Sequence, residues 1–204
     1  KSYRPISLMS FVLKVLEKTI ERSIREEVLI NRPLHADQFA YRAGRSSETA
    51  LHVIVGGLEK TLLEKEIALA AFIDIEGAFD NTPHQVIAET IGGAGVPGTL
   101  CGWIRAMLSS RIVSMSINDV RLQARVGAGC PQGGVLSPLL WSVVVDGLLK
   151  LLTENGYKVV GYADDIAIVV SGKFSKFSCV RFVPQCCTSS WTSSGGGVSC
   201  SYGK

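Results

Sequence analysis

The sequence contains no uncharged apolar run long enough to cross a membrane. Its most apolar stretch, residues 135–152, is interrupted by Asp146 and Lys150, whereas a membrane-spanning helix needs roughly 18 or more consecutive apolar residues. The composition of a disordered chain is absent as well, because 47% of the 204 residues are hydrophobic and 19% are charged. We therefore expect one folded domain with its own core and no membrane partner.

Cysteine is scarce before residue 179, where only Cys101 and Cys130 occur. Both lie in apolar surroundings, which predicts buried thiols and not a disulfide framework. We expect a reducing, intracellular setting, with nucleus and cytoplasm left undistinguished. The first residue is Lys1 and no signal peptide is visible, so we expect a piece of a longer chain.

Several catalytic signatures are missing. The sequence has neither the phosphate-binding pattern G-x-x-x-x-G-K-[ST] nor the hydrolase pattern G-x-S-x-G, and no His/Cys cluster with the spacing of a metal site. Basic residues are concentrated in residues 1–45, which hold nine Lys and Arg against five Asp and Glu. This imbalance suits a polyanion-binding surface, although ordinary solvated helix faces explain it equally well.

Apolar periodicity predicts helices and strands in alternation. Residues 12–28 form an amphipathic helix with charged residues, Glu17 among them, on the face opposite Val12, Leu16, Ile20, Ile24 and Val28. Further helices are expected over residues 47–66, from Thr82-Pro83 onward, and over residues 137–152. Residues 68–75 predict a strand buried on both faces, residues 111–126 a hairpin around Asn118-Asp119, and residues 157–170 a second strand pair.

Three aspartates stand next to predicted buried strands. Asp74 ends the strand over residues 68–75, and Asp164-Asp165 join the last two strands. A single Asp at a strand end is usually a cap, and an Asp-Asp turn is usually just exposed. Together, however, strands of one sheet would bring the three carboxylates close, and their mutual repulsion would be offset best by Mg²⁺. Two such ions would suit in-line transfer of a phosphoryl group.

Two further features suit a nucleotide. The run Gly129-Cys130-Pro131-Gln132-Gly133-Gly134 precedes the helix at residue 137, and its glycines permit close approach of a flat ligand. Phe79 follows Asp74 by five residues, where an aromatic ring would clash with a ribose 2′-OH and favour deoxynucleotides. The alternatives are a plain loop and an apolar anchor for a turn. We expect Asp80 to be a local cap or turn residue and not a metal ligand.

Five sequence blocks, taken together, resemble the reverse transcriptases of non-LTR retrotransposons, most of all the jockey-like elements of arthropods. The blocks occur in the family's order and cover residues 3–8, 38–46, 72–80, 129–138 and 162–165. The resemblance implies an α/β (α+β) right-hand polymerase with fingers and a palm, the palm having a ferredoxin-like antiparallel sheet and flanking helices. It places the fingers at roughly 1–66 and the palm at roughly 67–174, with the thumb missing.

The resemblance also implies roles for individual residues. Asp74, Asp164 and Asp165 match the catalytic aspartates that bind two Mg²⁺ ions, for which Mn²⁺ is a substitute, and the Ile75 carbonyl matches a further ligand. The nucleotide-binding positions match Arg4, Phe79, Gln132 and Gly133, and Arg42 and Arg45 match template or phosphate contacts. The implied partners are an RNA template, a DNA primer and dNTPs. One template contact is missing, because Ala128 stands where the family usually carries a basic residue.

The chain changes character near residue 174. Residues 175–204 are rich in Ser, Gly and Cys and lack the family's continuation, so we predict a disordered, non-family tail. Two functions follow as expectations. One is an RNA-directed DNA polymerase domain of a retrotransposon that transfers dNTPs to a primer 3′ end. The other is a truncated, inactive remnant that at most binds nucleic acid. An RNA-templated RNA polymerase is disfavoured by Phe79.

Overall fold

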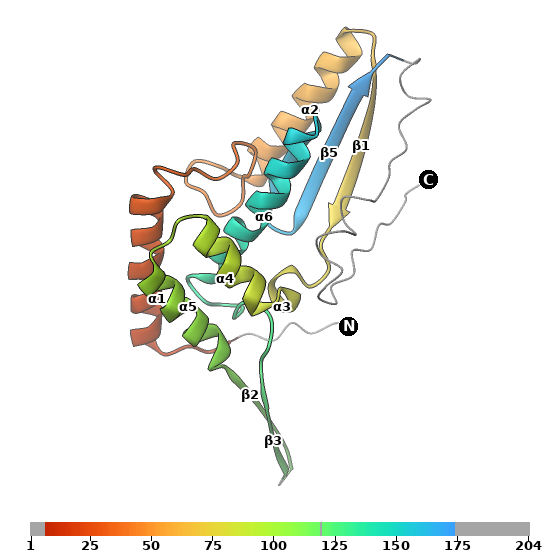
Figure 1. Cartoon of the computed structure of the whole chain (residues 1–204). Helices are drawn as coiled ribbons and strands as arrows, with labels where there is room; N and C mark the ends of the chain where they lie inside the picture. The colour runs from red at the N-terminus through yellow and green to blue at the C-terminus, as the bar shows by residue number, and fades with distance from the viewer. Residues whose placement is uncertain (1–6, 119, 174–204) are drawn as a thin grey trace. The chain divides into compact units, whose positions relative to one another are not determined.

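The computed structural model of this protein describes residues 7–118 and 120–173 (Figure 1). They form a mixed α/β fold with two small antiparallel sheets, as predicted. The chain divides into two compact units. The first unit comprises residues 1–34 and 77–144, and the second comprises residues 35–76 and 145–204. The predicted tail at 175–204 lies outside the described residues.

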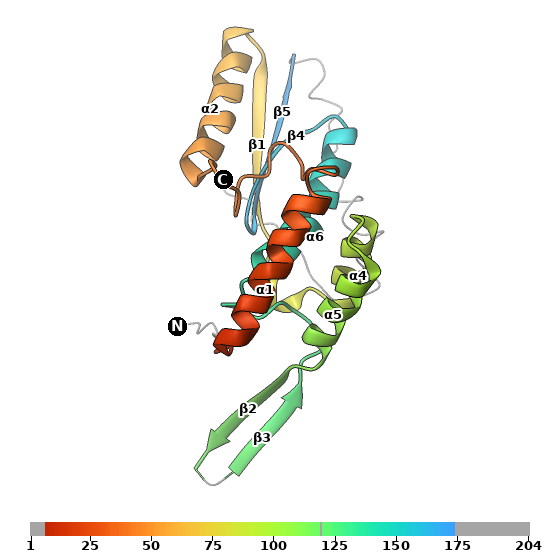
Figure 2. The same cartoon turned by 90° about the vertical axis from the view of Figure 1, so that its left-hand side faces the viewer.

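The first unit is mainly helical. Its elements are α1 (Phe11–Ser23) with a π-helical segment (Ile24–Val28), α3 (Ala78–Asn81), α4 (His84–Gly93), α5 (Gly98–Ser109), β2 (Ile112–Ile117), β3 (Val120–Arg125) and the start of α6 (Ser137–Glu154). Helices α4 and α5 lie side by side in both views (Figure 2). Their contact face is fully buried at Ile87, Ile91, Ile104 and Leu108. Helix α5 is absent from the sequence prediction.

Helix α1 confirms the prediction over residues 12–28 but not its faces. The Ser10 hydroxyl caps its start by accepting from Leu13 N at 3.3 Å. Ile20, Ile24 and Val28 are buried as expected. Val12 and Leu16 are exposed, and Glu17, predicted on the solvated face, is completely buried. The predicted apolar face was thus wrong for the first half of this helix, where Glu17 faces the interior and accepts hydrogen bonds from backbone N–H groups.

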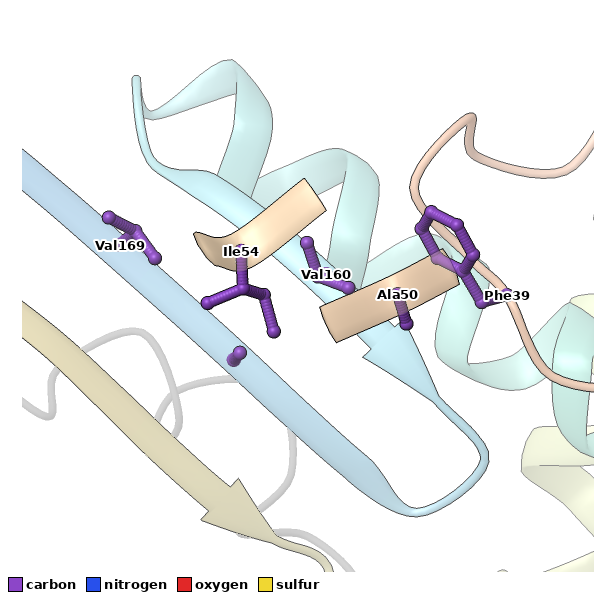
Figure 3. Close-up of a cluster of buried hydrophobic side chains, with 6 residues drawn as sticks. Phe39, Ala50, Ile54, Val160 and Val169 are labelled. Carbon is purple, nitrogen blue, oxygen red and sulfur yellow. The ribbon is translucent and has the colours of Figure 1, made fainter. Parts of the chain in front are cut away.

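The second unit contains a three-stranded antiparallel sheet. Its elements are α2 (Ser47–Leu63), β1 (Ile67–Asp74), β4 (Lys158–Tyr162), β5 (Asp165–Gly172) and the remainder of α6, and the strand order is β1-β5-β4. A reciprocal capping box between Ser46 and Thr49 starts α2. The underside of α2 packs on the sheet in a buried cluster of Phe39, Ala50, Ile54, Val160, Ala167 and Val169 (Figure 3).

Strand β1 differs from its prediction. It was expected to be buried on both faces, but none of its residues falls in the buried class, and Phe72 is 68% exposed. Edge position alone does not explain this, because β4 lies at the other edge and is buried at residues 159–161. In β1 the partly buried Ala70 packs against the cluster under α2, while Leu69 and Phe72 are exposed. The central strand is β5, which is buried from Ile166 to Val169. An apolar run alone does not distinguish a central strand from an edge strand.

At two predicted helix starts, the residue predicted to cap the helix is not at the N-cap position. Pro83 and not Thr82 is the N-cap of α4, because the Thr82 hydroxyl donates to the Ala78 carbonyl at 2.6 Å. Helix α6 begins at Ser137, so Leu136 and not Ser137 is at its N-cap position, and the Ser137 hydroxyl donates to the Pro131 carbonyl at 2.8 Å. Cys130 is buried as expected, whereas Cys101 is only partly buried. Across the described ranges, no helix combines the length and apolar content that crossing a bilayer requires.

Candidate active site

The three aspartates predicted to act together are adjacent in the sheet of the second unit. Asp74 is the last residue of β1 and Asp165 the first of β5, and the two are direct partners in the antiparallel register. Asp164 lies one residue earlier in the turn, and its carbonyl accepts from Ile75 N at 3.2 Å. Residues 90 positions apart are thus brought together at one end of the sheet, and Ile75 lies beside them.

The turn that carries Asp164 has a demanding backbone. Tyr162 pairs with Asp165, so Ala163 and Asp164 are the two central residues of the hairpin. Ala163 has φ 56°, the left-handed conformation that tight hairpins require at their first central position. This conformation costs an alanine roughly 1 kcal/mol or more. The paired strands that continue into the buried part of the sheet hold the turn in this shape.

The carboxylates act on each other and on a neighbouring tyrosine. Desolvation by burial, with the nearby charges of Asp164 and Asp74, raises the pKa of Asp165 above its ordinary value. Desolvation and the charges of Asp164 and Tyr162 likewise raise the pKa of Tyr41. Tyr41 also has φ 58°. Sequence reasoning missed Tyr41. It lies in the block at residues 38–46, in which roles were predicted only for Arg42 and Arg45.

The donor set suits a hard divalent cation. Carboxylate oxygens are the ligands that Mg²⁺ prefers, and a cation offsets the repulsion that, after desolvation by burial, also raises the pKa of Asp165. Within residues 7–118 and 120–173, no three Asp, Glu, His or Cys side chains stand close enough to hold an ion as they are oriented. Asp74 and Asp165 are neighbours in the strand register, and a metal site at this end of the sheet stays a prediction.

A groove of about 440 Å³ adjoins these carboxylates within the second unit. Leu51 and Ile54 line it from α2, and Phe72 lines it from β1. Asp74 and Asp165 line it as well. The acidic end of the sheet therefore continues into an apolar surface.

The glutamine loop, residues 129–136, belongs to the first unit. The Gln132 side-chain Nε2 donates to Asp80 Oδ2 at 2.8 Å, and the backbone carbonyl of Gln132 accepts from Ser7 N at 2.9 Å. Gly129 has φ 80°, and a Cβ there would lie 2.4 Å from the Asp80 carbonyl oxygen, so only glycine fits. Gly133 is exposed and also has positive φ. The side chain of Asp80, expected to cap locally, instead orients Gln132.

Phe79 is held from two sides. Its ring lies 5.7 Å from that of Trp141 with an interplanar angle of 37°, and its carbonyl accepts from Cys130 N at 2.6 Å. Trp141 is buried while Phe79 is only partly so. Both the anchoring role and a contact with a ligand are compatible with this position.

The predicted template contacts Arg42 and Arg45 bind the protein's own backbone. Arg42 Nη1 donates to the carbonyls of His35 at 2.8 Å and Gln38 at 3.2 Å. Arg45 donates to the Ala36 carbonyl and lies 4.6 Å above the Phe39 ring. Both arginines thus order the segment before α2. Arg4 lies outside the described residues.

A second residue that sequence reasoning missed is the acidic Glu17. Its carboxyl Oε2 accepts from Val135 N at 2.6 Å and from Leu136 N at 3.3 Å, at the end of the glutamine loop. The amphipathic pattern assigned it to the solvated face, so periodicity carried no signal for this role. Only the tertiary contact reveals it.

Comparison with known proteins identifies relatives along most of the chain. A family model described as reverse transcriptase (RNA-dependent DNA polymerase) matches residues 1–191, a range that passes the predicted start of the tail. The RNA-directed DNA polymerase from mobile element jockey of Drosophila melanogaster is 28% identical over 178 residues, covering 84% of this chain and 19% of that protein. Its Drosophila funebris counterpart is 30% identical over 174 residues, covering 82% and 19%.

Solved structures show the same fold at low identity. A telomerase from Candida albicans, solved with a fragment of telomeric RNA, superposes with TM-score 0.55 and 14% identity over 92% of this chain and 34% of that one. An apo telomerase from Candida tropicalis gives TM-score 0.54 and 13% identity over 81% and 35%. The chain spans about a fifth of the length of the curated relatives it matches.

Proposed function

The chain belongs to the reverse transcriptase (RNA-dependent DNA polymerase) family, and from this premise we propose that it carries the fingers and palm of a retrotransposon polymerase. The proposed reaction adds dNTPs to the 3′ end of a DNA primer on an RNA template. The observation that supports it most directly is the register pairing of Asp74 with Asp165, with Asp164 in the adjoining turn.

The proposed metal ligands are Asp74, Asp164, Asp165 and the Ile75 carbonyl. When bound, two Mg²⁺ ions would lower the pKa of the primer hydroxyl and stabilise the oxygens of the leaving phosphate. The protein's own contribution is to hold the carboxylates at one end of a buried sheet. The tight turn at Ala163 sets the spacing of Asp164 from Asp165, and burial of β5 keeps that spacing rigid.

The proposed nucleotide contacts are Arg4, Phe79, Gln132 and Gly133. The contact with Asp80 uses one N–H of the Gln132 side-chain amide, so the side-chain oxygen Oε1 of Gln132 points away from Asp80. The ring of Phe79, supported by Trp141, is the proposed barrier to a ribose 2′-OH. Arg42 and Arg45 are proposed to shape the segment that meets the template, through the backbone carbonyls they bind.

The second candidate is an inactive remnant that at most binds nucleic acid. It is favoured by one observation, namely that among the described residues no three Asp, Glu, His or Cys side chains form a group that could hold a metal ion. The remnant would keep the paired strand ends without the metal chemistry. The two candidates differ in one measurable property, which is extension of a primer.

Primer extension on an RNA template with Mg²⁺ tests the proposal. Asp164→Asn should reduce extension at least about 100-fold, because a charge that stabilises the transition state is removed. Glu64→Gln, an exposed change at the end of α2, is the matched control and should leave the rate unchanged. Equal extension by wild type and Asp164→Asn would overturn the assigned site. No extension by either would favour the remnant.

A further inference from the structure

Glu17 makes an unusual contact for a charged side chain on a surface helix. It has 0% exposure, and its Oε2 accepts from Val135 N at 2.6 Å and Leu136 N at 3.3 Å. These two amides immediately precede Ser137, the first residue of α6. A side chain from α1 therefore binds the N-terminus of a helix more than 100 residues later.

Helix α6 needs such a partner. The first N–H groups of any helix lack an acceptor within the helix, and a nearby side-chain oxygen usually supplies one. The N-cap position, immediately before Ser137, is occupied by Leu136, whose apolar side chain cannot accept a hydrogen bond. Negative charge is also favoured at the positive end of the helix dipole. Glu17 provides both the acceptor and the charge.

The neighbouring Glu21 shows what is particular about Glu17. Glu21 is also buried, at 7% exposure, but it pairs with Lys18 on α1 and with Arg25 on the π-helical segment that follows it. For Glu17 the described residues offer no ion pair, and its buried Oε1 has no hydrogen-bond partner. A buried acidic group without a basic partner is costly. The backbone amides of the glutamine loop are what hold Glu17 in place.

The contact lies close to the residues proposed to meet the nucleotide. Gly134 N donates to the Pro131 carbonyl at 2.9 Å, so Gln132 and Gly133 lie inside a tight turn. Ser7 N holds this turn at the Gln132 carbonyl and Asp80 holds it at the Gln132 amide. Glu17 holds the remaining end. Without the Glu17 contact, the exposed Gly133 and its neighbours would become more mobile relative to the start of α6.

We propose that Glu17 is a positioning residue that fixes the glutamine loop, and with it Gln132 and Gly133, for the incoming nucleotide. This inference rests on the proposed polymerase function and deepens it. The contact also ties α1 to the start of α6, so the first helix of the chain determines the shape of a loop that follows it by more than 100 residues.

Three variants of the full chain test the proposal. Glu17→Leu removes both acceptor oxygens, Glu17→Gln keeps one acceptor in nearly the same shape, and Glu21→Gln is the matched control on the same helix. The first readout is hydrogen exchange of the Val135 and Leu136 amides, with the buried amide of Ile87 as the global reference. The second is the KM for dNTP, compared with kcat, in primer extension.

Glu17→Leu should speed exchange at Val135 and Leu136 at least about tenfold relative to Ile87. It should also lower kcat/KM by up to about 100-fold, mainly through KM. Glu17→Gln should fall between Glu17→Leu and wild type, and Glu21→Gln should match wild type at both amides. If Glu17→Leu fails to fold, Glu17→Gln carries the same comparison.

Unchanged exchange at Val135 and Leu136 in both Glu17 variants would overturn the proposal. Faster exchange with a KM no different from that of Glu21→Gln would also overturn it, since Glu17 would then only cap α6. Absence of extension in wild type would count against the polymerase function alone. In that event the exchange readout still decides whether Glu17 holds the loop.

Discussion

The two hairpins of this protein have a similar backbone where the first strand ends and differ in burial. In each, the residue that follows the first strand has left-handed φ, 52° at Asn118 and 56° at Ala163. Strand β3 is exposed along its whole length, whereas β5 is buried from Ile166 to Val169. The same local design therefore serves an exposed ribbon and the centre of a core.

The difference shows what a hairpin needs in order to carry chemistry. A turn sets the register of its strands, but an isolated two-stranded ribbon is only marginally stable. The β4–β5 hairpin gains a third strand, β1, on one side and the cover of α2 on one face. Asp164 and Asp165 are thereby held on a rigid base. We expect three measurements to separate the two hairpins, with effects of decreasing size.

The largest difference should come from truncating one apolar side chain in each hairpin. Ile168 on β5 is 5% exposed and Leu122 on β3 is 56% exposed. Ile168→Ala should lower the free energy of unfolding by about 2–4 kcal/mol, since it leaves a cavity in the core. Leu122→Ala should change it by less than about 0.5 kcal/mol. Urea denaturation measures both, and similar losses would show that β2–β3 is also part of the cooperative core.

A smaller difference should arise at the turns. Ala163→Gly should raise the free energy of unfolding by up to about 1 kcal/mol, because glycine adopts φ 56° without strain. Ala163→Val should lower it by roughly 1–2 kcal/mol. Asn118→Gly should gain only a few tenths of a kcal/mol, since asparagine tolerates this conformation better. A stabilising Ala163→Val variant would contradict the turn geometry.

The smallest effect should come from the carboxylates. Burial and the charges of Asp164 and Asp74 raise the pKa of Asp165, so the folded state holds that proton more tightly than the unfolded state. Stability from this group is present below its ordinary pKa and is lost as the pH rises through the raised value.

Asp165→Asn removes the titrating carboxyl group, and with it the loss of stability at pH values above the raised pKa. The variant should raise the Tm at pH 7 by about 1–2 °C and by less at pH 4. Mg²⁺ should then raise the Tm of wild type more than that of Asp165→Asn. A lower Tm for the variant at pH 7 would show that the three carboxylates do not repel one another in the free protein.

Much of the β4–β5 region was predictable from sequence. Its strands, its turn and the approach of Asp74 to Asp164-Asp165 followed from apolar runs that end in acidic residues, and the register confirms their pairing. The exposure of β1 was not predictable, because what covers each face of a strand depends on the rest of the fold. Roles in binding metal and nucleotide stay predictions that rest on the family's motifs.

The helical contacts were less accessible to sequence reasoning. Glu17 has the spacing of a solvated residue, and Asp80 has that of a cap. Each contacts the glutamine loop across a separation of 52 or more residues. No local period encodes such a distance. The arginines of the block at residues 38–46 likewise have backbone partners that spacing could not specify.

The sequence by itself determined the family, most of the helices and strands, and the two tight turns, because each depends on neighbouring residues or on motifs in a fixed order. Only the tertiary structure decided which apolar strand lies at the edge and which acidic side chains are buried. The physical reason is that burial and long-range hydrogen bonding depend on what packs against a residue. That information is held by residues elsewhere in the chain.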